Sequence, residues 1–120
     1  MLLRRLALRT TRRLYHGPPT RDIRFTLFDV HGFTSHYDSL ESECDNETVD
    51  MVIDATAALC TNELAPVNAA ADKEGCTRID ATTVKTPTGF KEAYDVFTES
   101  GWQGLSFPEK YGGQGLPMSL

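Results

Sequence analysis

The chain has 120 residues, enough for one small domain, and its 40% apolar and 24% charged residues are ordinary for a soluble globular protein. The formal net charge is −5, but the first fifteen residues carry five arginines and no acid, so without them the charge falls to −10. This acidic remainder argues against nucleic-acid binding, which needs clustered Lys and Arg, and no apolar run is long enough for a membrane span.

The N-terminal segment, residues 1–15, is rich in Arg and Leu and lacks acids. Such a segment is amphipathic when helical and is typical of mitochondrial targeting peptides, whereas its broken apolar run is too short for a secretory signal. Arg13, Leu14 and Tyr15 are similar to a matrix-protease site, which predicts cleavage after Tyr15 and a mature protein in the mitochondrial matrix. The alternative is a basic tail that lies on an acidic surface.

Residues 21–33 are compatible with two secondary structures. Every second residue from 23 to 27 is apolar, as in a strand, but the apolar residues up to Val30 also fit one side of a short helix. Gly32 suits the position just after a helix end. A polar, acidic linker is predicted for residues 34–46, and its acids are interpreted as solvated rather than catalytic.

Apolar residues then recur at three- and four-residue steps, which predicts an amphipathic helix. These residues are Val49, Val52, Ile53, Ala57, Cys60 and Leu64. Asp45 or Asn46 is expected to cap the start of this helix, and Pro66 is expected to end or bend it. Residues 67–74 are then expected to fray into a loop that Gly75 closes.

A second amphipathic helix is predicted further along the chain. Thr86 is expected to cap it, with Pro87 as its first residue, and Gly101 is expected to stop it in a left-handed conformation. Its apolar stripe consists of Phe90, Ala93, Tyr94 and Phe97. Because so few helices bury only a modest surface, both stripes are expected to need a partner, either another protein or more of the same chain.

The residue types that bind metals occur here without the spacing of a known site. The histidines are His16, His31 and His36, and the cysteines are Cys44, Cys60 and Cys76. His31, His36 and Cys44 match no zinc pattern, and the cysteines form neither a metal motif nor a disulfide framework. We expect free thiols, with Cys60 as a small core residue, and histidines that are solvated or packed.

The glycine-rich stretch 112–117, Gly-Gly-Gln-Gly-Leu-Pro, was compared with phosphate-binding loops. It lacks the Gly-x-Gly-x-x-Gly order of a dinucleotide-binding loop and the Gly-Lys-Ser/Thr ending of a Walker loop. A glycine turn that joins two helices is the simpler interpretation, with Pro117 suited to open the next helix.

Residues 89–117 combine a hydrophobic-aromatic helix, a Gly-Trp step at 101–102, a Pro-Glu-x-Tyr segment at 108–111 and the turn at 112–117. In this order they resemble the N-terminal helical domain of acyl-CoA dehydrogenases. Upstream, residues 63–76 look like the ending of the family's first helix. Residues 21–33 look like the N-terminal extension of the 3-methylmercaptopropionyl-CoA dehydrogenase-like branch.

This resemblance implies an all-α fold, a partial N-terminal helical domain with two or three amphipathic helices and long loops. The domain is assigned to residues 47–120, after a targeting peptide at 1–15 and an extension at 16–46 with a short helix and an acidic linker. The resemblance also implies an FAD-dependent oxidoreductase for fatty-acid or related acyl-CoA catabolism. In the complete enzyme, a carboxylate base removes the α-proton of an acyl-CoA thioester, and flavin N5 accepts hydride from the β-carbon.

The family's catalytic Glu and its main flavin contacts lie in domains without a counterpart here, so no catalytic, cofactor-binding or metal residue is assigned. We therefore expect a truncated N-terminal portion that is inactive alone and holds no FAD itself. Its partners would be the remaining domains of the enzyme or a homo-oligomer partner, with acyl-CoA bound only by the complete protein. The alternative is a non-catalytic helical interaction subunit of a mitochondrial complex, whose acidic body suits a basic partner.

Overall fold

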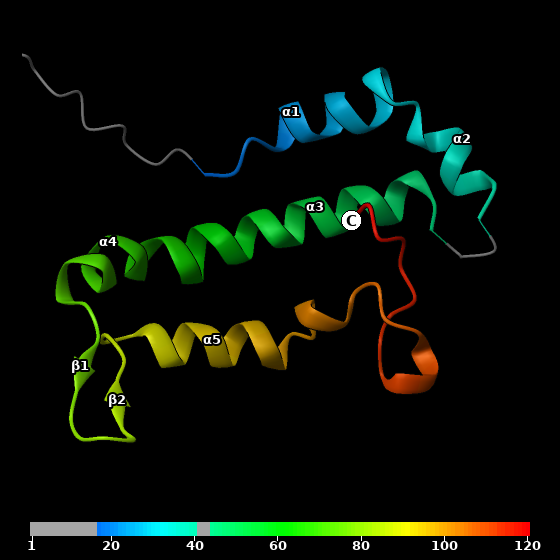
Figure 1. The fold of residues 1–120 in the computed structure, drawn as a ribbon. Coiled ribbons are helices and arrows are strands. Elements are labelled where there is room, and N and C mark those ends of the chain that lie inside the picture. The colour runs from blue at the N-terminus through cyan, green and yellow to red at the C-terminus, as the bar shows by residue number, and fades with distance from the viewer. Residues whose placement is uncertain (1–16, 41–43) are drawn as a thin grey trace, which may run out of the picture.

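The computed structural model describes residues 17–40 and 44–120. These residues are mostly helical, with one small hairpin, which confirms the predicted all-α class (Figure 1). In chain order the elements are α1 (Thr20–Arg24), η1 (Phe25–Val30), α2 (Phe33–Asp38), α3 (Asn46–Leu59), η2 (Cys60–Leu64), α4 (Ala65–Glu74), β1 (Thr77–Arg78), β2 (Val84–Lys85), α5 (Phe90–Glu99), η3 (Trp102–Gly104) and η4 (Glu109–Tyr111). The predicted targeting peptide, its cleavage point after Tyr15, and His16 lie outside the described residues.

The centre of the fold is a long helical column, α3–η2–α4, with α1 along one side and α5 along the other (Figure 1). Asp45 caps the column as predicted, since its carboxylate accepts the Thr48 N–H at 2.7 Å. This hydrogen bond from the backbone of Thr48 is the main reason why the pKa of Asp45 is lowered.

Of the two outcomes predicted at Pro66, an end or a bend of the helix, the end is wrong. The π-helical turn η2 leads directly into α4, and Pro66 lies in the first turn of that helix, where a missing N–H costs little. Residues 67–74 are therefore helical instead of frayed. Gly75 ends α4 with a φ of 68°, in agreement with its predicted place at the end of this segment.

The helical alternative for residues 21–33 is the one that forms, as α1 and η1, and Gly32 follows with a φ of 63°. The linker predicted for residues 34–46 is wrong in its first part, because Phe33–Asp38 form α2. The reason is burial: Tyr37 is 1% exposed and stacks on Phe33, with 5.5 Å between the ring centroids. The burial of Tyr37 depends on residues far away in sequence, among them Val49 and Leu116.

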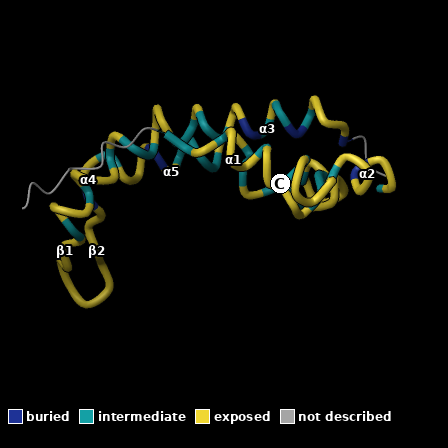
Figure 2. Tube along the Cα trace, turned by 90° about the horizontal axis from the view of Figure 1, so that it is seen from above, coloured by how far each residue is buried: buried dark blue, intermediate teal, exposed yellow. Residues whose placement is uncertain are grey.

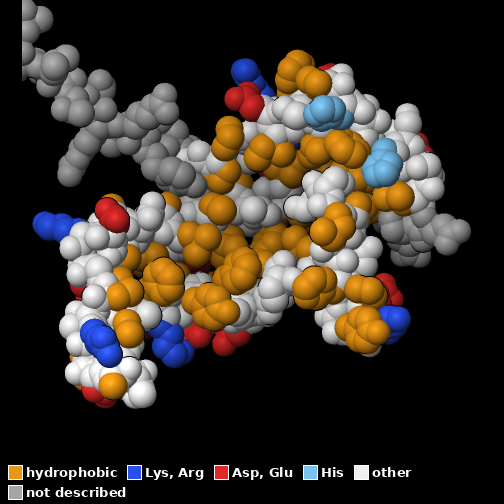
Figure 3. Space-filling model, in the orientation of Figure 1, with side chains coloured by type: hydrophobic (Ala, Val, Ile, Leu, Met, Phe, Trp, Pro, Cys, Tyr) orange, Lys and Arg blue, Asp and Glu red, His pale blue; other side chains and the backbone are white. Residues whose placement is uncertain are grey.

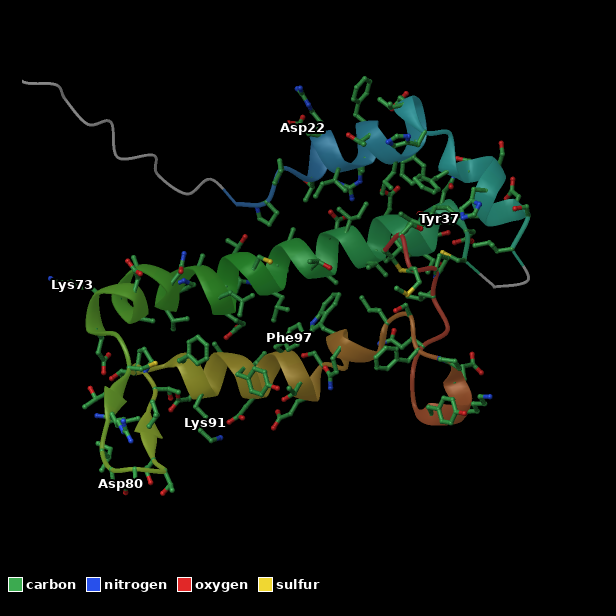
Figure 4. All side chains as sticks on the ribbon, viewed as in Figure 1. Asp22, Tyr37, Lys73, Asp80, Lys91 and Phe97 are labelled. Atoms are coloured by element: carbon green, nitrogen blue, oxygen red, sulfur yellow. The ribbon has the colours of Figure 1, made fainter. Side chains whose placement is uncertain are left out.

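A hydrophobic core joins α2 to the start of α3. Its buried members are Tyr37, Cys44, Val49 and Ile53, and Leu27, Phe28, Phe33, Leu40, Leu116 and Leu120 pack against them. Figure 2 shows that the described buried residues are few, and Figure 4 shows Tyr37 between α2, α3 and the C-terminal segment. Burial also raises the pKa of the Cys44 thiol, with a smaller effect from the nearby Asp45 carboxylate.

Arg24 ties α1 to α3 across the edge of this core. Its Nε donates to Asp50 Oδ1 at 2.5 Å, and its Nη2 donates to Asp54 Oδ1 at 2.8 Å. These carboxylates, Asp54 first, raise the pKa of the Arg24 guanidinium. The two bonds thus link α1 to α3.

The chain between α4 and α5 forms a short antiparallel hairpin, in which Thr77 pairs with Lys85 and Arg78 with Val84. This hairpin was not predicted from the sequence. The predicted start of the second helix is also wrong, because α5 begins at Phe90, after a left-handed Gly89. Thr88 donates its N–H to Glu74 Oε2 at 2.9 Å, so this segment is bonded to α4 before the next helix begins.

After α5, the chain turns at Gly101, whose φ of 74° confirms its predicted left-handed conformation. Residues 112–116 then return alongside residues 104–107, with Gly115 N–H bonded to Phe107 O and Leu116 N–H bonded to Leu105 O, both at 2.9 Å. The backbones approach so closely that a Cβ on Gly113 would lie 2.0 Å from Phe107 O. Only glycine fits there without a shift.

The returning segment carries the C-terminal residues to the core at the α3 end of the column. Leu116 and Leu120 pack against the core, and the hydroxyls of Tyr37 and Ser119 lie 3.0 Å apart. Pro117 opens a turn that the Leu120 N–H closes by bonding to Pro117 O at 3.1 Å. The glycine turn thus connects α5 to a core formed by α2 and α3.

Candidate functional site

An apolar groove lies between the η2–α4 part of the column and α5. It encloses about 800 Å³ and is open to solvent. Figure 3 shows hydrophobic side chains gathered along this part of the molecule. We call this surface the α4–α5 groove; its lining includes Cys60, Leu64, Val67, Ala71, Phe90, Ala93, Tyr94 and Phe97.

One wall of the groove is the apolar stripe predicted for α5. Ala93 is buried, whereas Phe90 and Tyr94 are 50% and 58% exposed. Tyr94 and Phe97 lie side by side with ring centroids 6.3 Å apart, and Figure 4 shows Phe97 between α5 and the column. Large aromatic side chains this exposed are typical of a surface that binds something.

The other wall comes from η2 and α4. Sequence reasoning missed most of it, because residues 67–74 were expected to be a loop. Val67 and Ala71 repeat at the four-residue spacing of a helix, a signal that the preceding Pro66 obscured. Cys60 was expected in the core, but it is half-buried and lines the groove, and the buried thiol is Cys44.

Two contacts hold the groove walls together at its hairpin end. Glu74, the last residue of α4, accepts both the N–H and the hydroxyl of Thr88, at 2.9 and 3.2 Å. Val67 packs against Gly89 so closely that a Cβ there would lie 2.9 Å from the valine Cγ1. The groove is therefore held by defined contacts at the point where α5 starts.

The polar content of the groove is small. Among the described residues that line it, Asp72 is the only one with a formal charge at neutral pH, and Cys60 and Cys76 provide thiols. All three cysteines are free, as expected. This lining offers contact area for an apolar partner and few groups for acid–base chemistry.

The histidines and acids elsewhere form no metal cluster in the described part of the chain. His31 and His36 are both exposed and lie edge-on to Phe33, with centroids 5.9 and 5.3 Å away, which agrees with the expectation of solvated or packed histidines. His16 and two of the linker acids, Glu41 and Glu43, lie outside the described residues. That no residue is catalytic, cofactor-binding or metal-binding stays a prediction.

The glycine turn has no free amides for a phosphate. Within the described chain, the N–H groups of residues 112–116 all bond to backbone carbonyls of residues 104–109, at distances between 2.8 and 3.3 Å. An anion-binding loop needs N–H groups that point at the ligand. The turn therefore serves to position Leu116 and the residues after it.

No helix in the described ranges has the length and apolar content to cross a membrane. Residues 46–119 match a family model described as "Acyl-CoA dehydrogenase, N-terminal domain". The chain is also similar to 3-methylmercaptopropionyl-CoA dehydrogenase of Ruegeria pomeroyi (strain ATCC 700808 / DSM 15171 / DSS-3), with 34% identity over 101 residues. This alignment covers 82% of the chain and 17% of the relative, so the chain spans about a sixth of the relative's length.

Proposed function

The chain belongs to the acyl-CoA dehydrogenase family, and we propose that it supplies the N-terminal helical part of an FAD-dependent enzyme that oxidises an acyl-CoA thioester. The observation that carries this proposal is the match of residues 46–119. That range begins with the first residue of α3 and includes the column, α5 and the glycine turn. The proposed substrate is a fatty acyl-CoA or a related acyl-CoA.

In the complete family protein, FAD would supply the two-electron acceptor for hydride from the substrate. The described residues do not fit this cofactor. The amides of the glycine turn already have partners, and the carboxylate of Asp72 in the α4–α5 groove would repel a pyrophosphate. We therefore assign no flavin contact to this chain, and its proposed role is a helical layer against which other domains or a second subunit pack.

A chimera tests this role directly. Residues 46–119 would replace the matching segment of the Ruegeria pomeroyi relative, and flavin content and acyl-CoA oxidation would be measured with an artificial electron acceptor. We expect a flavin-loaded, active chimera. The matched control is the same chimera with Gly113→Val, which should lose both properties because the close backbone approach at Phe107 O excludes a side chain. An inactive chimera that folds and binds flavin would contradict the proposed role.

We also propose that the chain alone is not a catalyst. The purified chain, mixed with FAD and acyl-CoAs from short to long, should reduce no electron acceptor. Turnover by the chain alone would contradict this proposal and would place a catalytic group among residues to which we assign none.

The second candidate function is a helical interaction subunit of a mitochondrial complex. The open α4–α5 groove and the acidic body support this candidate, since both suit a basic apolar partner. Native protein that co-purifies with a large assembly lacking acyl-CoA oxidation would favour it over the dehydrogenase. A stably folded monomer without partners would argue against it.

We propose the mitochondrial matrix as the location of the protein, on the composition of residues 1–15. The test is the N-terminus of the protein isolated from cells. We expect the mature chain to begin at His16, after cleavage behind Tyr15. An intact Met1 in protein recovered from the cytosol would contradict this location.

A further inference from the structure

The charges around the α4–α5 groove define the kind of partner that it fits. Its walls are η2, α4 and α5, which together carry six acids and two lysines; these are Glu63, Asp72, Glu74, Glu92, Asp95, Glu99, Lys73 and Lys91. Lys91 is already paired with Asp95. An apolar groove between acidic helices fits an amphipathic helix with an aliphatic face and basic flanks.

A second copy of the described surface is a poor match for this groove. Without the first fifteen residues the chain carries a net charge of −10. Two such bodies packed groove to groove would bring like charges together, at a cost that their apolar contact would have to exceed.

The chain itself contains a segment with the required composition, residues 1–16. It has five arginines, five leucines and no acid. Four of those leucines, at positions 2, 3, 6 and 14, alternate with arginines, so a helix there would be both aliphatic and basic. The acids of the groove walls and the arginines of this segment are complementary.

The segment joins the described chain at Gly17, just before α1, which lies on the opposite side of the column from α5 (Figure 1). A Cβ built on Gly17 would lie 3.4 Å from Thr61 Oγ1. Thr61 belongs to η2, whose Cys60 and Leu64 line the groove. Sixteen residues in a helix span about 24 Å, and the ten-residue α4 spans about 15 Å. To reach the groove, the segment must pass around the column, which as a helix is about 10 to 12 Å wide, and its length is sufficient for this.

We propose that residues 1–16 dock in the α4–α5 groove, with their leucines against its apolar walls and their arginines near its acids. Since the segment is tethered at Gly17, docking within one chain is favoured by a high effective concentration. A docked segment hides the apolar face that a targeting peptide must present to any receptor. Docking and targeting would then compete for the same leucines. The proposal does not depend on the dehydrogenase function.

The native thiols provide the test, because Cys60 and Cys76 line the groove whereas Cys44 lies in the separate core. Alkylation of each cysteine by iodoacetamide would be followed by mass spectrometry in the full chain and in the variant Leu3→Asp/Leu6→Asp. If the segment occupies the groove nine-tenths of the time, a cysteine beneath it is alkylated about tenfold more slowly. We therefore expect Cys60 and Cys76 to react several-fold faster in the variant and Cys44 to react equally in both. If Cys60 and Cys76 each reacted at the same rate in the full chain and in the variant, the proposal would be overturned.

Further measurements separate apolar docking within one chain from an effect of charge and from binding of a second copy. The variant Thr10→Asp/Thr11→Asp changes the charge equally but keeps the leucines, so it should retain most of the protection; a loss as large as that of the leucine variant would overturn apolar docking. A synthetic peptide of residues 1–16 should restore protection to the leucine variant. Protection that rises with the concentration of the unmodified chain would assign the groove to a second copy and overturn docking within one chain.

Discussion

The two ends of the long helical column are built from the same local pattern but differ in what covers them. At the α3 end, Val49 and Ile53 are buried under α2 and the C-terminal residues. At the α4 end, Val67 and Ala71 line the open α4–α5 groove, and the aromatic residues Phe90 and Tyr94 on its other wall stay half-exposed. An apolar stripe thus shows which face of a helix binds something, while segments distant in sequence decide whether that face becomes core.

The first prediction compares two tyrosines, one from each end. Tyr37→Ala should destabilise the chain by about 3 to 5 kcal/mol, because it leaves a cavity in the core and removes the partner of Ser119. Tyr94→Ala, at a position 58% exposed in the α4–α5 groove, should cost far less. Denaturant unfolding followed by circular dichroism would measure both values. Equal losses would show that the groove is as well packed as the core.

This contrast also explains what the sequence predicted and what it did not. The Asp45 cap, the stripe of α5 and the stop at Gly101 depend on neighbouring residues, and their prediction is confirmed. Tyr37 was placed in a linker because its partners, Val49 and Leu116, lie far away in sequence. Such long-range packing overrides the polar composition around it.

The lining of the groove was likewise predicted only in part. The stripe from Cys60 to Leu64 and that of α5 were expected to need a partner, and both line the groove. Its α4 wall was missed because Pro66 usually ends a helix, whereas here it falls in the first turn of a new one. The hairpin was missed because its strands are two residues long and exposed, so they carry no alternation of buried and exposed residues.

The second prediction concerns the glycine turn, residues 112–117, which leads the chain from α5 to the core at the α3 end of the column. Gly113→Ala should destabilise the chain by about 1 to 3 kcal/mol, since the new Cβ would clash with Phe107 O and displace Leu116 from the core. Gly104→Ala is the matched control, because the nearest atom to its Cβ would be 3.6 Å away. If both variants unfolded at the same denaturant concentration, the close approach at Gly113 would have no structural role.

The third prediction compares two aspartates whose pKa values are both lowered, chiefly by backbone N–H groups. Asp45 accepts the Thr48 N–H at the start of α3, and Asp80 accepts those of Thr82 and Thr83 in the exposed hairpin loop. Asp45→Ala should lower the unfolding midpoint less than Gly113→Ala does. Asp80→Ala should lower it least, because the hairpin packs against little else.

The pH dependence follows from the sign of the Asp45 shift. Because the pKa of Asp45 is lower in the folded chain than in the unfolded one, its carboxylate stabilises the fold fully above the ordinary aspartate pKa of about 3.9. That contribution fades as the pH falls below this value and is lost once the folded carboxyl takes up its proton. The midpoints of the unmodified chain and Asp45→Ala should therefore differ at pH 7 and converge in acid. A difference that persists at the lowest pH would show that the cap acts through packing instead of charge.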